Sequence, residues 1–150
     1  MARVFAQEDG NLSTRPITTS RTTSYADIDL TFAKKTNGEV FKKTDAAAVK
    51  QAVKNLLMTN EGEKPFNYRF GGNLNSYLFA LSEDVDNIDI EDAIRMAIHN
   101  NEPRAAVMGV QVLLKEYYNS MHVLVQFQVV NTLETAELNL ELTRLREWLL

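Results

Sequence analysis

The sequence has no cysteine, two histidines, three prolines and no long apolar run. The missing cysteine excludes disulfides, thiolate metal ligands and cysteine nucleophiles. His99 and His122 are too few for a histidine-built zinc site, so we expect no metal ion and no cofactor. No segment is long and apolar enough to span a membrane, and the N-terminus has no signal-peptide core. These absences predict a soluble protein made in the cytoplasm, without a membrane partner.

A basic surface is also missing. The chain has 16 Lys and Arg residues against 20 Asp and Glu residues, a formal net charge of −4. We therefore expect no nucleic-acid partner, because such a partner requires clustered Lys and Arg. The Gly71-Gly72 pair lacks the lysine and hydroxyl spacing of a phosphate-binding loop. The acids between Glu83 and Asp92 lack the glycine and ligand spacing of a calcium loop, and a helix dipole explains them better.

The length of 150 residues fits one domain with a real core. Residues 1–25 are polar and rich in Ser and Thr, so they cannot bury enough surface to fold alone. They are either a floppy terminus or an extended arm that orders on a neighbour. We therefore divide the chain into an extended N-terminal arm, 1–25, and one domain, 26–150.

Helical spacing occurs in three segments. Thr44-Asp45 offers an N-cap before an apolar stripe formed by Val49, Val53, Leu56 and Leu57. A short helix should carry Leu74 and Leu78. A third helix should run through Ile94 and Ile98 and end near Asn101, because Pro103 lacks an N–H and restricts the residue before it.

Strand spacing dominates after Pro103. One face of a long hairpin should carry the apolar residues Met108, Val110, Val112 and Leu114, followed by Met121, Val123, Val125, Phe127 and Val129. Ala136 to Leu142 alternate as a third strand, although the composition also permits a helix through Leu145 and Trp148. A short strand over Ile28–Phe32 and a turn at Asn37-Gly38 precede the first helix. The predicted fold class is α+β, with helices packed on an antiparallel sheet.

A loop between the first two helices combines glycines with large aromatic residues. Its paired glycines allow a tight bend, and Phe66 and Phe70 are large enough to anchor the loop on the core. The expected anchoring set is Gly62, Lys64, Pro65, Phe66, Phe70 and Gly71.

No catalytic constellation is evident, so we expect no catalytic residue. Neither histidine has the context of a nucleophile's base, and paired carboxylates carry little weight in a chain with 20 acids. The features that stand out favour assembly: a polar arm, a terminal strand that could pair with another chain, and an exposed arginine at the Glu102-Pro103-Arg104 corner.

Several motifs together resemble the baseplate-wedge, sheath-initiator family of contractile-tailed bacteriophages, which also includes a baseplate component of type VI secretion systems. The motifs are Leu57-Met58-Thr59, Gly62-Glu63-Lys64-Pro65-Phe66, Phe70-Gly71, Leu74 and Leu78 with Phe79, and Glu102-Pro103-Arg104 at the start of a strand. The resemblance extends from about Ile28 to Leu142 and does not distinguish a phage from a secretion system.

The resemblance implies a small domain related to the polymerising domain of the sheath subunit, located in the virion tail baseplate. In this family Glu102, Pro103 and Arg104 would fix the protein on the helical core bundle of the wedge. The terminal strand, with Leu138, Leu140 and Leu142, would template the first tail-sheath ring by strand exchange. The tail tube or hub is a candidate partner for the arm. Glu102 and Arg104 could instead only pair within their own domain.

Lys64 stands where the family often has arginine, and it lacks the planar fork that binds carboxylates bidentately. Some family members carry a lysozyme label, so a baseplate-associated, peptidoglycan-cleaving enzyme is the alternative function. No residue pattern here supports that activity.

Overall fold

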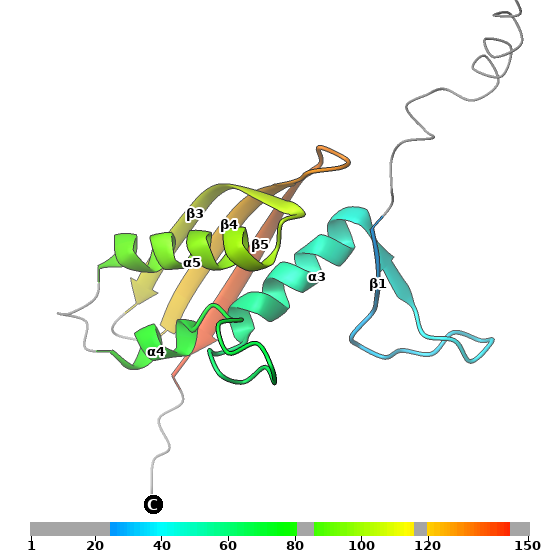
Figure 1. The fold of residues 1–150 in the computed structure, drawn as a ribbon, viewed down its shortest axis with the longest axis horizontal. Coiled ribbons are helices and arrows are strands. Elements are labelled where there is room, and N and C mark those ends of the chain that lie inside the picture. Colours follow the sequence, from blue (N-terminus) through cyan, green and yellow to red (C-terminus); the bar gives the residue numbers. More distant parts are fainter. Residues whose placement is uncertain (1–24, 81–85, 116–119, 145–150) are drawn as a thin grey trace, which may run out of the picture.

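A computed structural model describes residues 25–80, 86–115 and 120–144. Its elements are β1 (Ala26–Ile28), β2 (Lys42–Thr44), α3 (Asp45–Met58), α4 (Leu74–Phe79), α5 (Asn87–Asn101), β3 (Ala105–Lys115), β4 (Ser120–Val129) and β5 (Thr135–Thr143). Helices α3 and α5 lie on the same face of the sheet made by β3, β4 and β5 (Figure 1). This arrangement confirms the α+β class.

The main sheet is antiparallel with the strand order β3-β4-β5, so β3 and β5 are its edges. The alternating segment from Ala136 to Leu142 lies within β5, so this segment is a strand and not a helix. Leu145 and Trp148 lie outside the described residues. β1 and β2 form a separate two-stranded hairpin beyond the start of α3 (Figure 1).

The core lies between the two helices and the inner face of the sheet. α3 buries its predicted stripe, and α5 contributes Ile90, Ile94 and Ile98. The sheet supplies alternate residues, as the period of two predicted: Val110, Val112, Met121, Val123, Val125, Phe127, Val129, Leu138, Leu140 and Leu142. α5 ends at Asn101, as expected from Pro103. Within the described part of the chain, no helix is long and apolar enough to cross a membrane.

Met108 departs from the predicted pattern. We expected it to share the inner face with Val110 and Val112, and this is wrong. The register between β3 and β4 shifts between Val107 and Gly109, so Met108 is the extra residue of a β-bulge and its side chain is exposed. The sequence hides the bulge because Val107 and Met108 are both apolar, and either could begin the inner face.

The β1–β2 hairpin also differs from expectation. β1 ends at Ile28, and Phe32 has a positive φ of 52°, which an extended strand does not permit. Leu30 and Phe32 are exposed instead of packed. The predicted turn is present: Gly38 has a φ of 84° and its N–H donates to the carbonyl of Lys35.

α3 begins after Thr44, but not through the cap that we expected. The Thr44 side chain makes no cap hydrogen bond. The Asp45 backbone N–H donates to the Tyr25 carbonyl (2.7 Å), and the Tyr25 N–H donates to Asp45 Oδ1 (3.2 Å). Asp45 therefore fastens the chain at Tyr25 to the start of α3.

Candidate docking corner and sheet edge

The Glu102-Pro103-Arg104 corner is a tight turn between α5 and β3. The Glu102 N–H donates to the Ile98 carbonyl (2.8 Å), and the Ala105 N–H donates to the Glu102 carbonyl (3.1 Å). Glu102 is only 8% exposed, whereas Pro103 is exposed at the tip. The proline thus ends the helix, and the turn directs the next residue into the sheet.

Arg104 and Glu102 form a bidentate pair. Arg104 Nε donates to Glu102 Oε1 (2.6 Å) and Nη2 donates to Oε2 (2.8 Å), the geometry that makes such pairs strong. These hydrogen bonds to the Glu102 carboxylate raise the pKa of Arg104, so the guanidinium stays charged. The buried carboxylate is therefore neutralised by its neighbour two positions along the chain.

Arg104 also reaches the base of the β1–β2 hairpin. Its Nη1 donates to Asp27 Oδ2 (3.3 Å), and its guanidinium lies 5.4 Å from the centre of the Tyr25 ring. We expected an exposed arginine, but its side chain is only 27% exposed. Sequence reasoning missed Asp27 because 77 positions separate it from Arg104. Described residues thus engage three of the five N–H groups of the guanidinium, and the other two have no partner among them.

The loop after α3 is held by its own hydrogen bonds. Asn60 donates from its backbone N–H to Glu63 Oε2 (3.0 Å) and from Nδ2 to Oε1 (2.8 Å). The backbone hydrogen bond is the main cause that lowers the pKa of Glu63. The Gly62 N–H donates to the Tyr68 carbonyl (2.9 Å), which closes the loop. The loop therefore has a fixed shape without a ligand.

The two phenylalanines of this loop behave differently. Phe70 packs against the core, and Lys64 Nζ lies 3.8 Å from the centre of its ring. We expected Phe66 to anchor the loop as well, and this is wrong: it is fully exposed, with a positive φ of 65°. Pro65, just before it, is exposed too. The turn after Pro65 directs the Phe66 side chain away from the core.

Gly71 ties the loop to the end of α3. Its φ is +142°, and a Cβ there would lie 2.6 Å from the Thr59 carbonyl oxygen. Residues other than glycine are therefore excluded by both conformation and space. The next N–H, of Gly72, donates to the carbonyls of Leu56 and Thr59.

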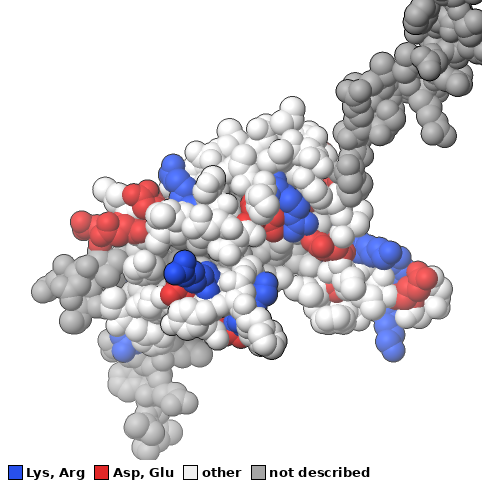
Figure 2. All heavy atoms as spheres, in the orientation of Figure 1, with Lys and Arg blue, Asp and Glu red and all other residues white. Residues whose placement is uncertain are grey.

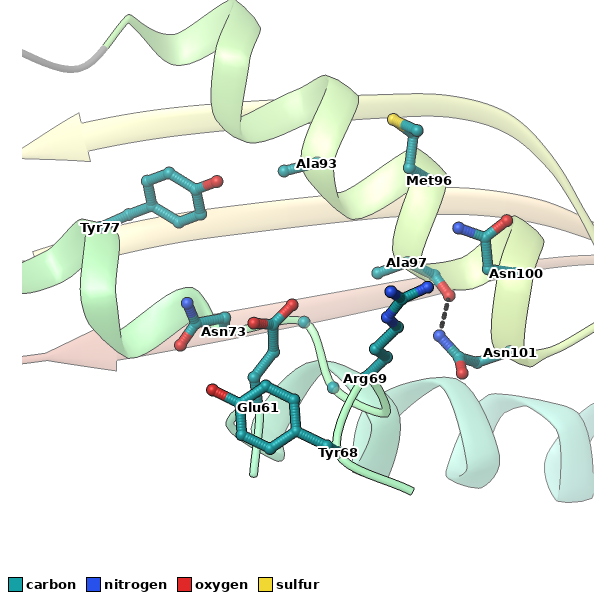
Figure 3. Close-up of a pocket in the computed structure, with 12 residues that line it drawn as sticks. Glu61, Tyr68, Arg69, Asn73, Tyr77, Ala93, Met96, Ala97, Asn100 and Asn101 are labelled. Carbon is teal, nitrogen blue, oxygen red and sulfur yellow. Dashed lines mark hydrogen bonds between the residues drawn. The ribbon is translucent and has the colours of Figure 1, made fainter. Parts of the chain in front are cut away.

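A cavity of about 690 Å³ lies between this loop, α4 and the C-terminal half of α5 (Figure 3). Arg69 points from the loop toward the end of α5, where Asn101 Nδ2 donates to the Ala97 carbonyl (2.9 Å). Among the described residues, the lining of this cavity contains one carboxylate, Glu61. A glycosidase site needs two carboxylates on either side of the scissile bond, and the described lining does not supply this pair. Among the described residues, no group of three His, Cys, Asp or Glu residues could hold a metal ion.

Along β5 the backbone N–H and C=O groups of successive residues point alternately toward β4 and toward the free edge. Two hydrogen bonds show which residues of β3 and β4 bond to each other: Val130 donates its N–H to the Arg104 carbonyl, and the Val112 N–H points away from β4 toward Glu91. The residue pairs of β4 with β5 then place the backbone groups of Leu138, Leu140 and Leu142 toward β4. The side chains of these leucines are buried in the core.

The groups at the free edge of β5 belong to the residues between these leucines. Alternation directs the backbone N–H and C=O groups of Glu137, Asn139 and Glu141 outward. In the part of the chain that the structure describes, these groups have no hydrogen-bond partner. Their side chains lie on the open face, where Glu137 accepts from Gln126 (2.6 Å) and Glu141 lies 2.9 Å from His122.

Comparison with known proteins places these features in a family. Residues 43–136 match the family described as baseplate wedge protein gp25, which covers the loop, the corner and the sheet as far as the start of β5. The baseplate wedge protein gp25 of Enterobacteria phage T4 is 26% identical over 113 residues, which span 75% of this chain and 86% of that protein.

Two solved structures share the fold. One is a crystal structure of a candidate tail lysozyme from Geobacter sulfurreducens, with a TM-score of 0.57 and 18% identity over 66% of this chain and 90% of that chain. The other is the anti-feeding prophage baseplate seen by cryo-electron microscopy, with a TM-score of 0.56 and 18% identity over 80% of this chain and 86% of that chain. At these identities the likeness concerns the fold alone. The family match is broader evidence, and it shows that the chain belongs to the gp25 family of baseplate wedge proteins, components of the tail baseplate of contractile-tailed phages.

Proposed function

We propose that this protein is a non-catalytic wedge component that binds the helical core bundle of the wedge through the Glu102-Pro103-Arg104 corner and templates the first sheath ring through β5. The observation that carries the proposal is the open edge of β5 in a chain that belongs to a baseplate wedge family. An edge strand with unpaired backbone groups can receive a strand from another chain.

The corner suits a rigid grip. Pro103 is exposed and its φ is fixed, so it loses little freedom when a partner covers it. Arg104 is held by Glu102 and Asp27 and keeps two N–H groups, which suit carboxylates or the free carbonyls at helix ends. Both the internal pairing and the docking role can therefore belong to one guanidinium.

The template role belongs to the backbone of β5. Leu138, Leu140 and Leu142 keep β5 in the sheet, and the outward groups of Glu137, Asn139 and Glu141 offer the hydrogen bonds for an added strand. The segment before Tyr25 is the proposed arm, and the tail tube or hub is its proposed partner. Tyr25 itself belongs to the domain, because it pairs with Asp45 and packs against the core.

The alternative function is peptidoglycan cleavage. A fold shared with a candidate tail lysozyme favours it, but the described residues that line the 690 Å³ cavity include only one carboxylate. A zymogram with the purified protein separates the two functions: we expect no clearing, and clearing that persists after removal of tags and contaminants would favour the enzyme.

The template role is tested with Asn139→Pro. Proline removes the outward N–H of this edge residue and leaves the hydrogen bonds to β4 in place. We expect normal folding and capture by wedge proteins, but loss of sheath on electron micrographs of assembled tails. Asn139→Ala, which keeps the N–H, is the control. Full-length sheaths from Asn139→Pro would place the template elsewhere.

The docking role is tested with two variants. Pro103→Ala removes an exposed ring and leaves the Arg104–Glu102 pair, so we expect weaker co-purification with wedge proteins and unchanged thermal stability. Arg104→Ala also leaves the Glu102 carboxylate buried and unpaired, which costs about 1–3 kcal/mol of stability. If both variants co-purify with the wedge as the wild type does, the corner only serves its own domain.

A further inference from the structure

A groove of about 480 Å³ runs beside the free edge of β5. β5 contributes Leu138 and Asn139 to it, the β1–β2 hairpin contributes Leu30 and Lys43, and α3 contributes a row of polar side chains. The row contains Lys50, Gln51 and Lys54. The strand edge, the hairpin and the helix thus line one groove, although they come from distant parts of the sequence.

The wall opposite β5 is held in place by Gln51. Its Nε2 donates to the Ile28 carbonyl (2.9 Å), and its Oε1 accepts from the Leu30 N–H (3.4 Å). The side-chain amide therefore pairs with the hairpin as a strand would. This contact fixes the hairpin against α3, so the width of the groove is set before any partner arrives.

The groove is basic in an acidic protein. Lys50 and Lys54 have no ion-pair partner among the described residues, and Lys43 lies 3.3 Å from Asp29. In Figure 2, acidic side chains gather near the start of α5, whereas the hairpin end of the molecule carries both basic and acidic side chains. Two unpaired ammonium groups beside an unpaired strand edge favour an occupant with carboxylates.

We infer that the β5 groove binds an extended acidic segment of another protein, added as a strand to β5 with alternate carboxylates facing Lys50 and Lys54. The inference rests on the proposed strand addition and specifies its partner chemically. Side chains alternate along a strand, so those that face α3 lie on the side of the lysine row. A second copy of this chain fits less well, because its β5 would place Glu137 and Glu141 beside the same residues on the open face.

The probe is a short capped peptide that alternates Thr and Glu, labelled for fluorescence anisotropy with the full-length protein. Its control is the isosteric peptide that alternates Thr and Gln. We expect the Glu peptide to bind about fivefold more tightly, since two exposed charge pairs contribute modestly. The difference should shrink at high salt.

Protein variants locate the effect. Lys50→Gln with Lys54→Gln should abolish the preference for Glu, whereas Lys34→Gln with Lys42→Gln makes the same change of net charge on the hairpin surface outside the groove and should preserve it. Asn139→Pro should abolish binding of both peptides.

The outcomes separate the two proposals. Binding of both peptides to Asn139→Pro would overturn strand addition at β5. Binding that Asn139→Pro abolishes but that shows no preference for Glu would leave strand addition intact and overturn the acidic partner. If the protein dimerises in a concentration-dependent way and Asn139→Pro abolishes this dimerisation, the occupant is a second copy of this chain. This result would also overturn the acidic partner.

Discussion

β3 and β5 are both edges of one sheet, but among the described residues only β3 has outward N–H groups that are bound within the domain. The outward N–H of Val112 donates to Glu91 Oε1 on α5 (3.0 Å), and that of Ala105 donates to the Glu102 carbonyl (3.1 Å). The bulge at Met108 interrupts the regular register of β3 as well. β5 pairs with β4 without a register shift and has no such protection among the described residues.

The difference shows which edge is the better candidate for the proposed strand addition. Soluble proteins protect edge strands with bulges, charges or covering elements because an open edge invites pairing with other chains. Because β3 is protected and β5 has a regular ladder, the proposed strand addition should occur at β5 and not at β3. Glu137 and Glu141 place charged side chains beside the open edge, a device that reduces unspecific pairing of edge strands.

The largest expected effect is the difference in stability between two proline substitutions at neighbouring positions of β5. Leu140→Pro removes an N–H that faces β4 and a buried side chain, a loss of about 3–6 kcal/mol in the free energy of unfolding. Asn139→Pro should change it by less than about 1 kcal/mol, because its N–H faces outward. Urea denaturation measures both values, and equal losses would contradict the assigned phase of the ladder.

A smaller effect is expected when the protection of β3 is removed. Glu91→Ala leaves the Val112 N–H without its carboxylate partner, which should lower the free energy of unfolding by about 1–3 kcal/mol. The variant should also self-associate through β3, as measured by analytical ultracentrifugation. Glu91→Gln keeps an acceptor oxygen and is the control. A monomeric Glu91→Ala protein would show that Glu91 does not protect the edge.

The smallest expected effect is a loss of local stability at low pH in the β1–β2 hairpin, which forms the groove wall opposite β5. The Thr31 backbone N–H, and then Lys43, hold the pKa of Asp29 below its ordinary value. The stabilisation is therefore present above about pH 4 and is lost as the pH falls through the lowered pKa. Amide hydrogen exchange at Thr31 should accelerate in acid relative to its intrinsic rate. Asp29→Asn should remove this pH dependence, and an unchanged dependence would assign it to another group.

Local patterns were sufficient to predict most of the fold. Pro103 predicted the end of α5, the apolar stripe predicted α3, and alternation predicted β4 and β5. Each of these features depends on residues within a few positions of one another, so the sequence displays them directly.

The wrong expectations concern side chains whose position depends on residues far apart in the sequence or on a single backbone angle. Nothing near Arg104 indicates that Asp27 binds it, and nothing before Phe66 indicates the positive φ that turns this ring outward. The bulge at Met108 adds one residue to an apolar run and leaves no mark in the composition. For the same reason, the basic groove at β5 was not evident: Lys50 and Asn139 line one groove only because tertiary packing brings α3 and β5 together.

The attachment of Tyr25 and Asp27 has a mechanical consequence. Tyr25, at the start of the domain, is held to α3 by its reciprocal hydrogen bonds with Asp45. Two residues later, the Asp27 carboxylate is bound by Arg104. Tension applied from the N-terminal side is therefore delivered first to the start of α3 and to the corner. The strand that we propose as the sheath template lies at the opposite edge of the sheet from the corner, so such a pull does not act first on its backbone.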